Sequence, residues 1–228
     1  MRVAALYDIH GNLPALEAVL PEVDADVILV GGDFVAGPWA SQTLERLREL
    51  GSGVRFIRGN ADRELGPDGE GSAPAAVLDF VRRSLSDEQL EFVLGQPERA
   101  SFDVDGLGGV LFCHATPRSD IELLTAASPE EDWRKALEET SESTVVCGHT
   151  HMQFDRRFGD VRVVNAGSVG MPYEREPGAY WVMLGPDVEF RRTPYEPGDI
   201  ERSGWPEEWP EATPEEATEF FEKLRAGT

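Results

Sequence analysis

Two histidines, His149 and His151, follow a short apolar run in the segment VVCGHTHMQF, with a single residue between them. They are half of the four histidines in the chain. Because a buried imidazole needs a hydrogen-bond partner, histidines this close together are seldom both core residues. The pair suits a solvated turn or one corner of a metal site, since neutral imidazole is the commonest metal ligand.

Other side chains that bind metals occupy equivalent positions, directly after an apolar run and often beside a glycine. The full set is Asp8, His10, Asp33, Asn60, His114, His149 and His151. Each motif alone also suits a helix cap, a loop or an ordinary turn. Ligands of open α/β sheets bind at the carboxyl ends of strands, however, and all four histidines share this position. The pattern therefore indicates one ligand set.

The ligand types predict two divalent ions. Three carboxylate or amide groups and four imidazoles exceed the needs of one tetrahedral zinc site. They suit two ions that share a carboxylate, and such a pair, about 3.5–4 Å apart, clamps both oxygens of a displacement at phosphorus. Oxygen and nitrogen ligands without a thiolate favour Mn²⁺, Fe²⁺ or Zn²⁺. Strand alternation turns Cys113 away from the face of His114, so we expect Cys113 and Cys147 to be buried structural thiols.

The elements that must position these residues are predicted by the apolar pattern. Residues 2–8, 26–33 and 53–60 read as strands, and 13–23 and 41–50 as helices, with Asn12 as an N-cap. This alternation predicts parallel strands. Further on, residues 63–98 are mostly helical around a break at 66–74. Strands follow at 102–105, 109–113 and 144–147, with a helix at 129–140. Hairpins are expected at 153–165 and 179–192, and an acidic helix at about 214–225.

Length and charge limit the classes of function. The 228 residues carry 43 acidic and 21 basic side chains, a formal net charge of −22. The negative electrostatic field of such a charge disfavours the binding of long nucleic acids. It allows a small phosphorylated substrate that is held through metal ions. We expect a single domain over 1–228, with an acidic, Trp- and Pro-rich C-terminal extension from about 196 to 228. No signal peptide and no membrane segment is expected, which predicts a cytoplasmic protein without a membrane partner. Homo-oligomerisation stays open.

In their order, the motifs resemble the calcineurin-like metallophosphoesterase superfamily, in particular its small bacterial and archaeal phosphodiesterase-like branch. The motifs that carry the resemblance are DIH (8–10), GGD (31–33), GNAD (59–62), CHATP (113–117), GHTH (148–151) and NAGSVGMP (165–172). The resemblance implies an α/β fold, a four-layer αββα sandwich with two mixed β-sheets and the metals at one edge.

The resemblance also implies roles for individual residues. Asp8, His10 and His151 would hold one metal, Asn60, His114 and His149 the other, and Asp33 would bridge them. A hydroxide between the metals would be the nucleophile. Asp33, Asn60 and Asp62 are the expected catalytic residues. Two divalent ions per chain are expected, with Mn²⁺ favoured and Fe²⁺, Zn²⁺ or Ni²⁺ as alternatives.

One position departs from the family pattern. Many members have a histidine after the asparagine of the third motif, where this chain has Ala61. The departure puts phosphomonoesters with poor leaving groups in doubt as substrates. A metal-dependent phosphodiesterase for a small phosphorylated molecule is the leading hypothesis. The alternatives are a dinucleoside polyphosphate hydrolase and a protein-interaction scaffold like the phosphoesterase-fold subunit of the retromer coat.

Overall fold

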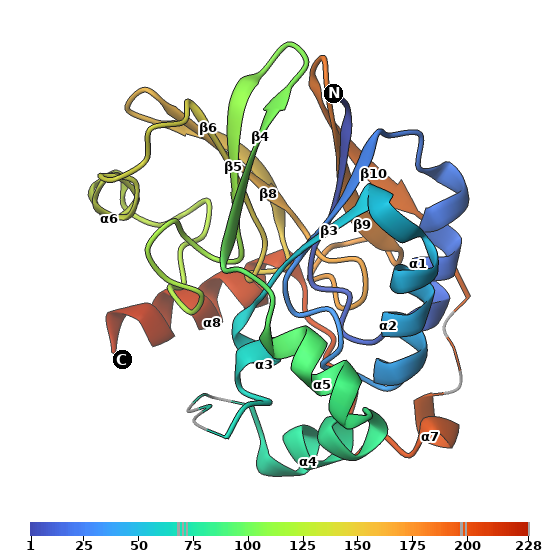
Figure 1. Cartoon of the computed structure of the whole chain (residues 1–228). Coiled ribbons are helices and arrows are strands. Elements are labelled where there is room, and N and C mark those ends of the chain that lie inside the picture. Colours follow the sequence, from blue (N-terminus) through green and yellow to red (C-terminus); the bar gives the residue numbers. More distant parts are fainter. Residues whose placement is uncertain (68, 70, 72, 197, 199, 228) are drawn as a thin grey trace.

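Two five-stranded β-sheets pack face to face between helices in the computed structural model of this chain (Figure 1). The structure describes residues 1–67, 69, 71, 73–196, 198 and 200–227. Both sheets contain parallel and antiparallel pairs. This arrangement confirms the predicted αββα sandwich with two mixed sheets.

The first sheet has the strand order β10-β9-β1-β2-β3. Its strands are β1 (Val3–Leu6), β2 (Val27–Gly31), β3 (Val54–Ile57), β9 (Ala179–Leu184) and β10 (Val188–Thr193). The predicted βαβ units are confirmed, because β1, β2 and β3 are parallel. The covering helices are α1 (Leu13–Val19), continued by the 3-10 turn η1 (Leu20–Glu22), α2 (Ala40–Glu49), α4 (Ala75–Ser84) and α5 (Asp87–Leu94). A second 3-10 turn, η2 (Gly51–Gly53), leads into β3.

The second sheet has the strand order β4-β5-β6-β8-β7. Its strands are β4 (Arg99–Val104), β5 (Gly108–Cys113), β6 (Thr144–Cys147), β7 (Gln153–Phe158) and β8 (Val161–Ala166). Only α6 (Glu130–Ala136) covers its outer face among the described helices, so this fourth layer is thin. The hairpins β7–β8 and β9–β10 turn at Gly159 and Gly185 as predicted.

Alternating side chains divide the core into three layers. Tyr7 of the first sheet packs against Phe112 and Val164 of the second, between the sheets. Cys113 and Cys147 point to the outer face, beside Trp133 of α6. Both thiols are buried as expected, and burial raises the pKa of Cys113 to about 12, so this sulfur stays protonated.

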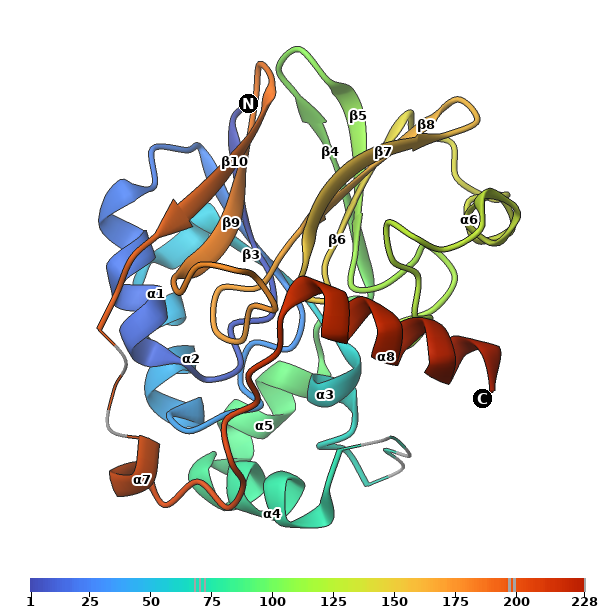
Figure 2. The same ribbon diagram turned by 180° about the vertical axis from the view of Figure 1, so that it is seen from behind.

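Three described helices remain. They are α3 (Asn60–Arg63), the unpredicted α7 (Ile200–Ser203) and α8 (Pro214–Ala226). Figure 2 shows α8 beneath the second sheet, running from the middle of the molecule outwards below α6. Glu222 accepts a hydrogen bond from Thr125, and Arg225 forms a 2.7 Å ion pair with Asp132. These contacts attach α8 to α6 and to the segment that precedes α6.

Two further expectations concern particular segments. Asn12 caps α1, because its side-chain oxygen accepts from the amide of Ala15 at 3.2 Å. Residues 68, 70 and 72 of the predicted break at 66–74 lie outside the described residues. No helix within the described ranges is both long and apolar enough to cross a membrane.

Candidate metal centre

The structure brings all seven predicted ligands to one end of the two sheets. Asp8, His10 and His151 form one group, and Asp33, His114 and His149 form a second. Within each group the ligand atoms lie within 4.8 Å of one another. Asp8 Oδ1 also lies 3.9 Å from His114 Nε2, so the two groups are adjacent. Asn60 joins the second group, with its Oδ1 3.1 Å from His114 Nε2.

The backbone at this centre adopts an unusual conformation. Within the described part of the chain, five residues other than glycine have positive φ, from 47° to 66°. They are Asp8, His10, Asp33, His149 and His151. Left-handed backbone at such residues costs about 1–3 kcal/mol each and persists where the surrounding structure enforces it. The strain turns the side chains out of the strand direction, so that ligands from both sheets converge.

Each of the two carboxylates uses one oxygen for the backbone and offers the other to the imidazoles. Asp8 Oδ2 accepts from the amide of His149 at 2.8 Å, and Asp8 Oδ1 lies 3.3 Å from His151 Nε2. Asp33 Oδ1 accepts from the amide of Ala61 at 2.8 Å, and Asp33 Oδ2 lies 3.3 Å from His114 Nε2. The backbone contacts fix the direction of the second oxygen.

Glycines of two motifs make room for these carboxylates. A Cβ on Gly59 would lie 2.1 Å from Asp33 Oδ1, and a Cβ on Gly148 would lie 2.3 Å from Asp8 Oδ2. Both distances are far below a van der Waals contact. The glycine in each motif therefore serves a carboxylate that comes from another loop.

The imidazoles are oriented by backbone carbonyls. The Nδ1 atoms of His10, His114 and His151 lie 3.2, 3.0 and 2.7 Å from carbonyl oxygens. Because a carbonyl only accepts, each Nδ1 carries a proton, and in the neutral ring Nε2 keeps a lone pair directed into the centre. His10 Nε2 and His151 Nε2 lie only 3.2 Å apart. A cation between them would satisfy both lone pairs.

Unsatisfied acceptors support the same conclusion. Asp8 Oδ1 and His149 Nε2 are buried, and neither has a hydrogen-bond partner among the described residues. Asn60 Oδ1 lies 3.0 Å from His149 Nδ1 and 3.1 Å from His114 Nε2. Acceptors that converge in a buried site need a proton or a cation between them. The residues present therefore fit two divalent metal ions.

The charges of the metal-free centre are consistent with this fit. Burial disfavours an imidazolium, but the carboxylates of Asp33 and Asp8 raise the pKa of His114 to about 10. Burial and the neighbouring His114 lower the pKa of His149 to about 4. A proton on His114 therefore balances the carboxylates when no cation is bound. A bound metal would replace that proton, because ligating imidazole must be neutral.

Asp62, one of the expected catalytic residues, makes its described contacts with the backbone. Its carboxylate accepts hydrogen bonds from the amides of Asp33 at 2.7 Å and Gly59 at 3.1 Å, and from Phe34 at 3.2 Å. All its described hydrogen bonds go to backbone amides. These contacts join the loop that carries Asp33 to the start of α3, which carries Asn60.

Sequence analysis missed two residues at this centre. The buried carboxylate of Glu64 accepts from Asn60 Nδ2 at 3.3 Å and from the amide of Ala73, which holds the amide oxygen towards the imidazoles. Glu64 follows Asn60 by four residues, and side chains at this spacing on a helix are neighbours, so the sequence could have indicated this contact. The ring of Tyr173 stacks on His151 with centroids 5.0 Å apart, a contact without a local signal.

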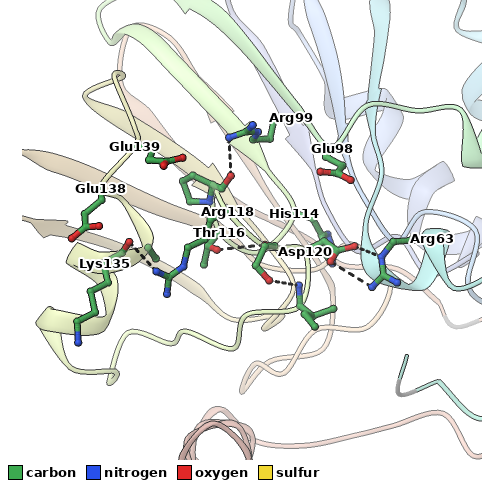
Figure 3. Close-up of a pocket in the computed structure, with 14 residues that line it drawn as sticks. Arg63, Glu98, Arg99, His114, Thr116, Arg118, Asp120, Lys135, Glu138 and Glu139 are labelled. Atoms are coloured by element: carbon green, nitrogen blue, oxygen red, sulfur yellow. Dashed lines mark hydrogen bonds and ion pairs between the residues drawn. The ribbon is translucent and has the colours of Figure 1, made fainter. Parts of the chain in front are cut away.

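A pocket of about 710 Å³ opens beside the centre (Figure 3). His114 and Arg63 lie at one end, and Lys135 lies at the other. Charged and hydroxyl side chains dominate its lining. Among the described residues, no aromatic ring other than the His114 imidazole lines it.

Comparisons with known proteins agree with this geometry. Bis(5'-nucleosyl)-tetraphosphatase (symmetrical) of Pectobacterium atrosepticum is 43% identical over 96 residues, which are 40% of this chain and 31% of the relative. The enzyme of the same name from Yersinia enterocolitica is 33% identical over 141 residues, which are 57% of this chain and 47% of the relative. The chain thus spans less than half the length of these curated relatives.

Solved structures share the fold over nearly the whole chain. A metallophosphoesterase from Sphaerobacter thermophilus is 26% identical, with a TM-score of 0.71, over 89% of this chain and 92% of its own. A hypothetical protein from Pyrococcus horikoshii OT3 is 20% identical, with a TM-score of 0.78, over 96% and 97% of the two chains. The family model of the calcineurin-like phosphoesterase superfamily domain matches residues 1–185, which include every ligand of the centre. The chain belongs to the calcineurin-like phosphoesterase superfamily.

Proposed function

We propose that this chain is a metal-dependent phosphodiesterase that hydrolyses a small phosphorylated substrate. The observation that carries the proposal is the pair of adjacent three-residue ligand groups, whose lone pairs converge without enough protons to satisfy them. Asp8, His10 and His151 would hold one ion, Asn60, His114 and His149 would hold the other, and Asp33 would contribute to both.

When bound, the ions supply Lewis acidity at phosphorus and a strong nucleophile at neutral pH. The chain's own residues then have simpler tasks. Asp33 and Asn60 belong to the reaction site, and Asp62 and Glu64 keep them in place through the contacts described above. Mn²⁺ is the proposed metal, with Fe²⁺, Zn²⁺ and Ni²⁺ as alternatives, because the ligands are oxygen and imidazole nitrogen without thiolate. We further propose one cytoplasmic domain over residues 1–228.

Two observations bear on the substrate class. The curated relatives are named as tetraphosphatases of dinucleosides, which supports the alternative of a dinucleoside polyphosphate hydrolase. Nucleobases, however, bind largely by stacking on aromatic side chains. The described lining of the pocket beside His114 is charged and offers no Phe, Tyr or Trp. This lining favours a phosphodiester with a polar alcohol group over a dinucleotide.

The hypothesis of a scaffold without turnover has less support. A protein that only binds partners does not need metal ligands that converge in a strained backbone. This chain has all seven predicted ligands. Strain of about 1–3 kcal/mol at each of five residues is typical of a site that must hold a reactive geometry.

A substrate screen tests the proposal. The full chain would be loaded with Mn²⁺, Fe²⁺, Zn²⁺ or Ni²⁺ and assayed on aryl and alkyl phosphodiesters, phosphomonoesters, cyclic nucleotides and dinucleoside polyphosphates. We expect phosphodiester hydrolysis that disappears on chelation and in Asp33→Asn. Preferential cleavage of dinucleoside polyphosphates would establish the alternative, and metal binding without hydrolysis of any of these substrates would favour the scaffold.

A further inference from the structure

The site lacks a cationic or proton-donating side chain at Ala61, and a charged pair lies close by. Arg63 is the last residue of α3, which begins with the ligand Asn60. Its Nε atom donates to Asp120 Oδ2 at 2.6 Å, and its Nη2 atom lies 3.4 Å from Asp120 Oδ1. This two-point contact fixes the plane of the guanidinium at the wall of the pocket (Figure 3).

The pair adjoins the metal ligands directly. The carbonyl oxygen of Asp120 lies 3.3 Å from the Asn60 amide atom that faces His114 and His149. Arg63 and His114 line the same end of the pocket. The hydrogen bond with Asp120 is the main reason why the pKa of Arg63 is raised, and the charges of Glu64 and Asp33 add to it. The side chains of Arg63 and Asp120 remain 27% and 21% exposed, so a ligand in the pocket can reach them.

An oriented guanidinium is well suited to phosphate. It carries five N–H donors, so it can contact a phosphate oxygen as well as Asp120, and its charge persists at every physiological pH. It stabilises negative charge on oxygen without giving up a proton. An arginine that lines the same pocket as His114 can therefore neutralise a phosphoryl group where Ala61 cannot.

We propose that Arg63, oriented by Asp120, binds the phosphoryl oxygens of the substrate on the side of the leaving group. This inference rests on the proposed phosphodiesterase function and adds a substrate-binding residue to it. Asp120 is a positioning residue that acts through Arg63. The rest of the pocket, towards Arg118 and Lys135, accepts the alcohol part of the ester.

The test compares Arg63→Ala and Arg63→Lys with a matched control. Arg46 is 30% exposed and pairs with Glu17 at 2.9 Å through the same Nε atom, on a helix that is not part of the site. Arg46→Ala therefore removes a similar ion pair without touching the pocket. The measurements are the Kd of inorganic phosphate for the metal-loaded full chain by calorimetry, its metal content, and kcat/KM on an aryl phosphodiester.

For Arg63→Ala we expect phosphate affinity and kcat/KM to fall about 10- to 100-fold, as for the loss of a charge-assisted hydrogen bond. Metal content should not change. Arg63→Lys should be intermediate, because it keeps the charge and loses the guanidinium group. Added guanidinium ion should restore part of the activity of Arg63→Ala, and Arg46→Ala should match the wild type.

Phosphate affinity and kcat/KM within twofold of the wild type in Arg63→Ala would overturn the inference. If Arg63→Ala fails to fold, Arg63→Lys becomes the test. Unchanged phosphate affinity in Arg63→Lys would then overturn the inference. The calorimetric measurement does not depend on turnover. A wild-type protein without hydrolytic activity would contradict the proposed function, while phosphate binding would still test Arg63.

Discussion

The carboxylate of Asp62 accepts a 2.7 Å hydrogen bond from the backbone amide of Asp33, and its side chain is fully buried. The same carboxylate accepts from the amide of Gly59 at 3.1 Å. Asp33 therefore depends for its position on a residue that comes from the asparagine motif of another loop. In a centre where five backbone positions are strained, such cross-loop contacts keep the ligands in place.

Asp62→Asn should destabilise the protein and weaken metal binding. The substitution replaces an acceptor oxygen by an NH₂ group that faces backbone N–H donors. A buried donor without a partner costs about 1–3 kcal/mol. Urea unfolding of the metal-free protein measures this loss. Asp24 is 93% exposed and pairs with Arg2, so Asp24→Asn is the control and should change the free energy of unfolding little. Equal stability of both variants would contradict the role given to Asp62.

Gly59→Ala should lower metal affinity and also destabilise the fold, because the new Cβ would lie 2.6 Å from the backbone nitrogen of Asp33. The new Cβ would lie 2.1 Å from Asp33 Oδ1, which would displace the carboxylate from the amide of Ala61. Loss of an orienting contact to a metal ligand typically costs about 10- to 100-fold in affinity. Gly53→Ala is the matched control, because the nearest atom to its Cβ would be 4.0 Å away. Calorimetric metal titration of both variants checks the difference, and wild-type affinity in Gly59→Ala would count against this packing.

Metal removal should lower the melting temperature, and each chain should bind two ions. A ligand at 100 times its Kd stabilises the native state by about 2.7 kcal/mol. For a protein of this size that corresponds to roughly 5–10 °C for each ion. Elemental analysis and thermal scans with and without chelator measure both quantities.

Asp33→Asn, in contrast, should lose most of this metal-dependent stabilisation together with turnover. Asp24→Asn should retain both. A single tightly bound ion in the wild-type protein, or none, would contradict the two-ion centre.

Because residue 61 is an alanine, kcat/KM should fall steeply as the pKa of the leaving group rises. General acid catalysis typically contributes about 10²–10⁴-fold, and an alanine can donate no proton. Arg63 would stabilise charge but would not protonate the leaving oxygen. We therefore expect aryl phosphodiesters to react much faster than alkyl phosphomonoesters, and Ala61→His to improve the alkyl substrates more. The measurement is kcat/KM across esters that differ only in leaving-group pKa. A flat dependence with rate-limiting chemistry would show that another residue acts as the acid.

Much of the site could be predicted from the sequence because its signals are local. A strand is marked by a short apolar run, and a ligand that follows it directly must lie at the strand's end. Parallel pairing of β1 with β2 and of β2 with β3 then brings Asp8, Asp33 and Asn60 together. The absence of an imidazole at Ala61 is visible in the same way. None of these statements needs a contact between distant segments.

The tertiary structure decided everything that depends on such contacts. The pairing of β1 with β9, which follows more than 170 residues later, has no periodic signature in either strand. Asp62 accepts from the amide of Asp33, Asp120 pairs with Arg63, and Tyr173 stacks on His151. Each of these pairs joins segments that lie apart in the sequence. A residue's type limits which partners it can have, but its partner is chosen by the fold. The predicted ligands of this centre can therefore be identified from the sequence, whereas the residues that orient them are determined only when the two sheets pack together.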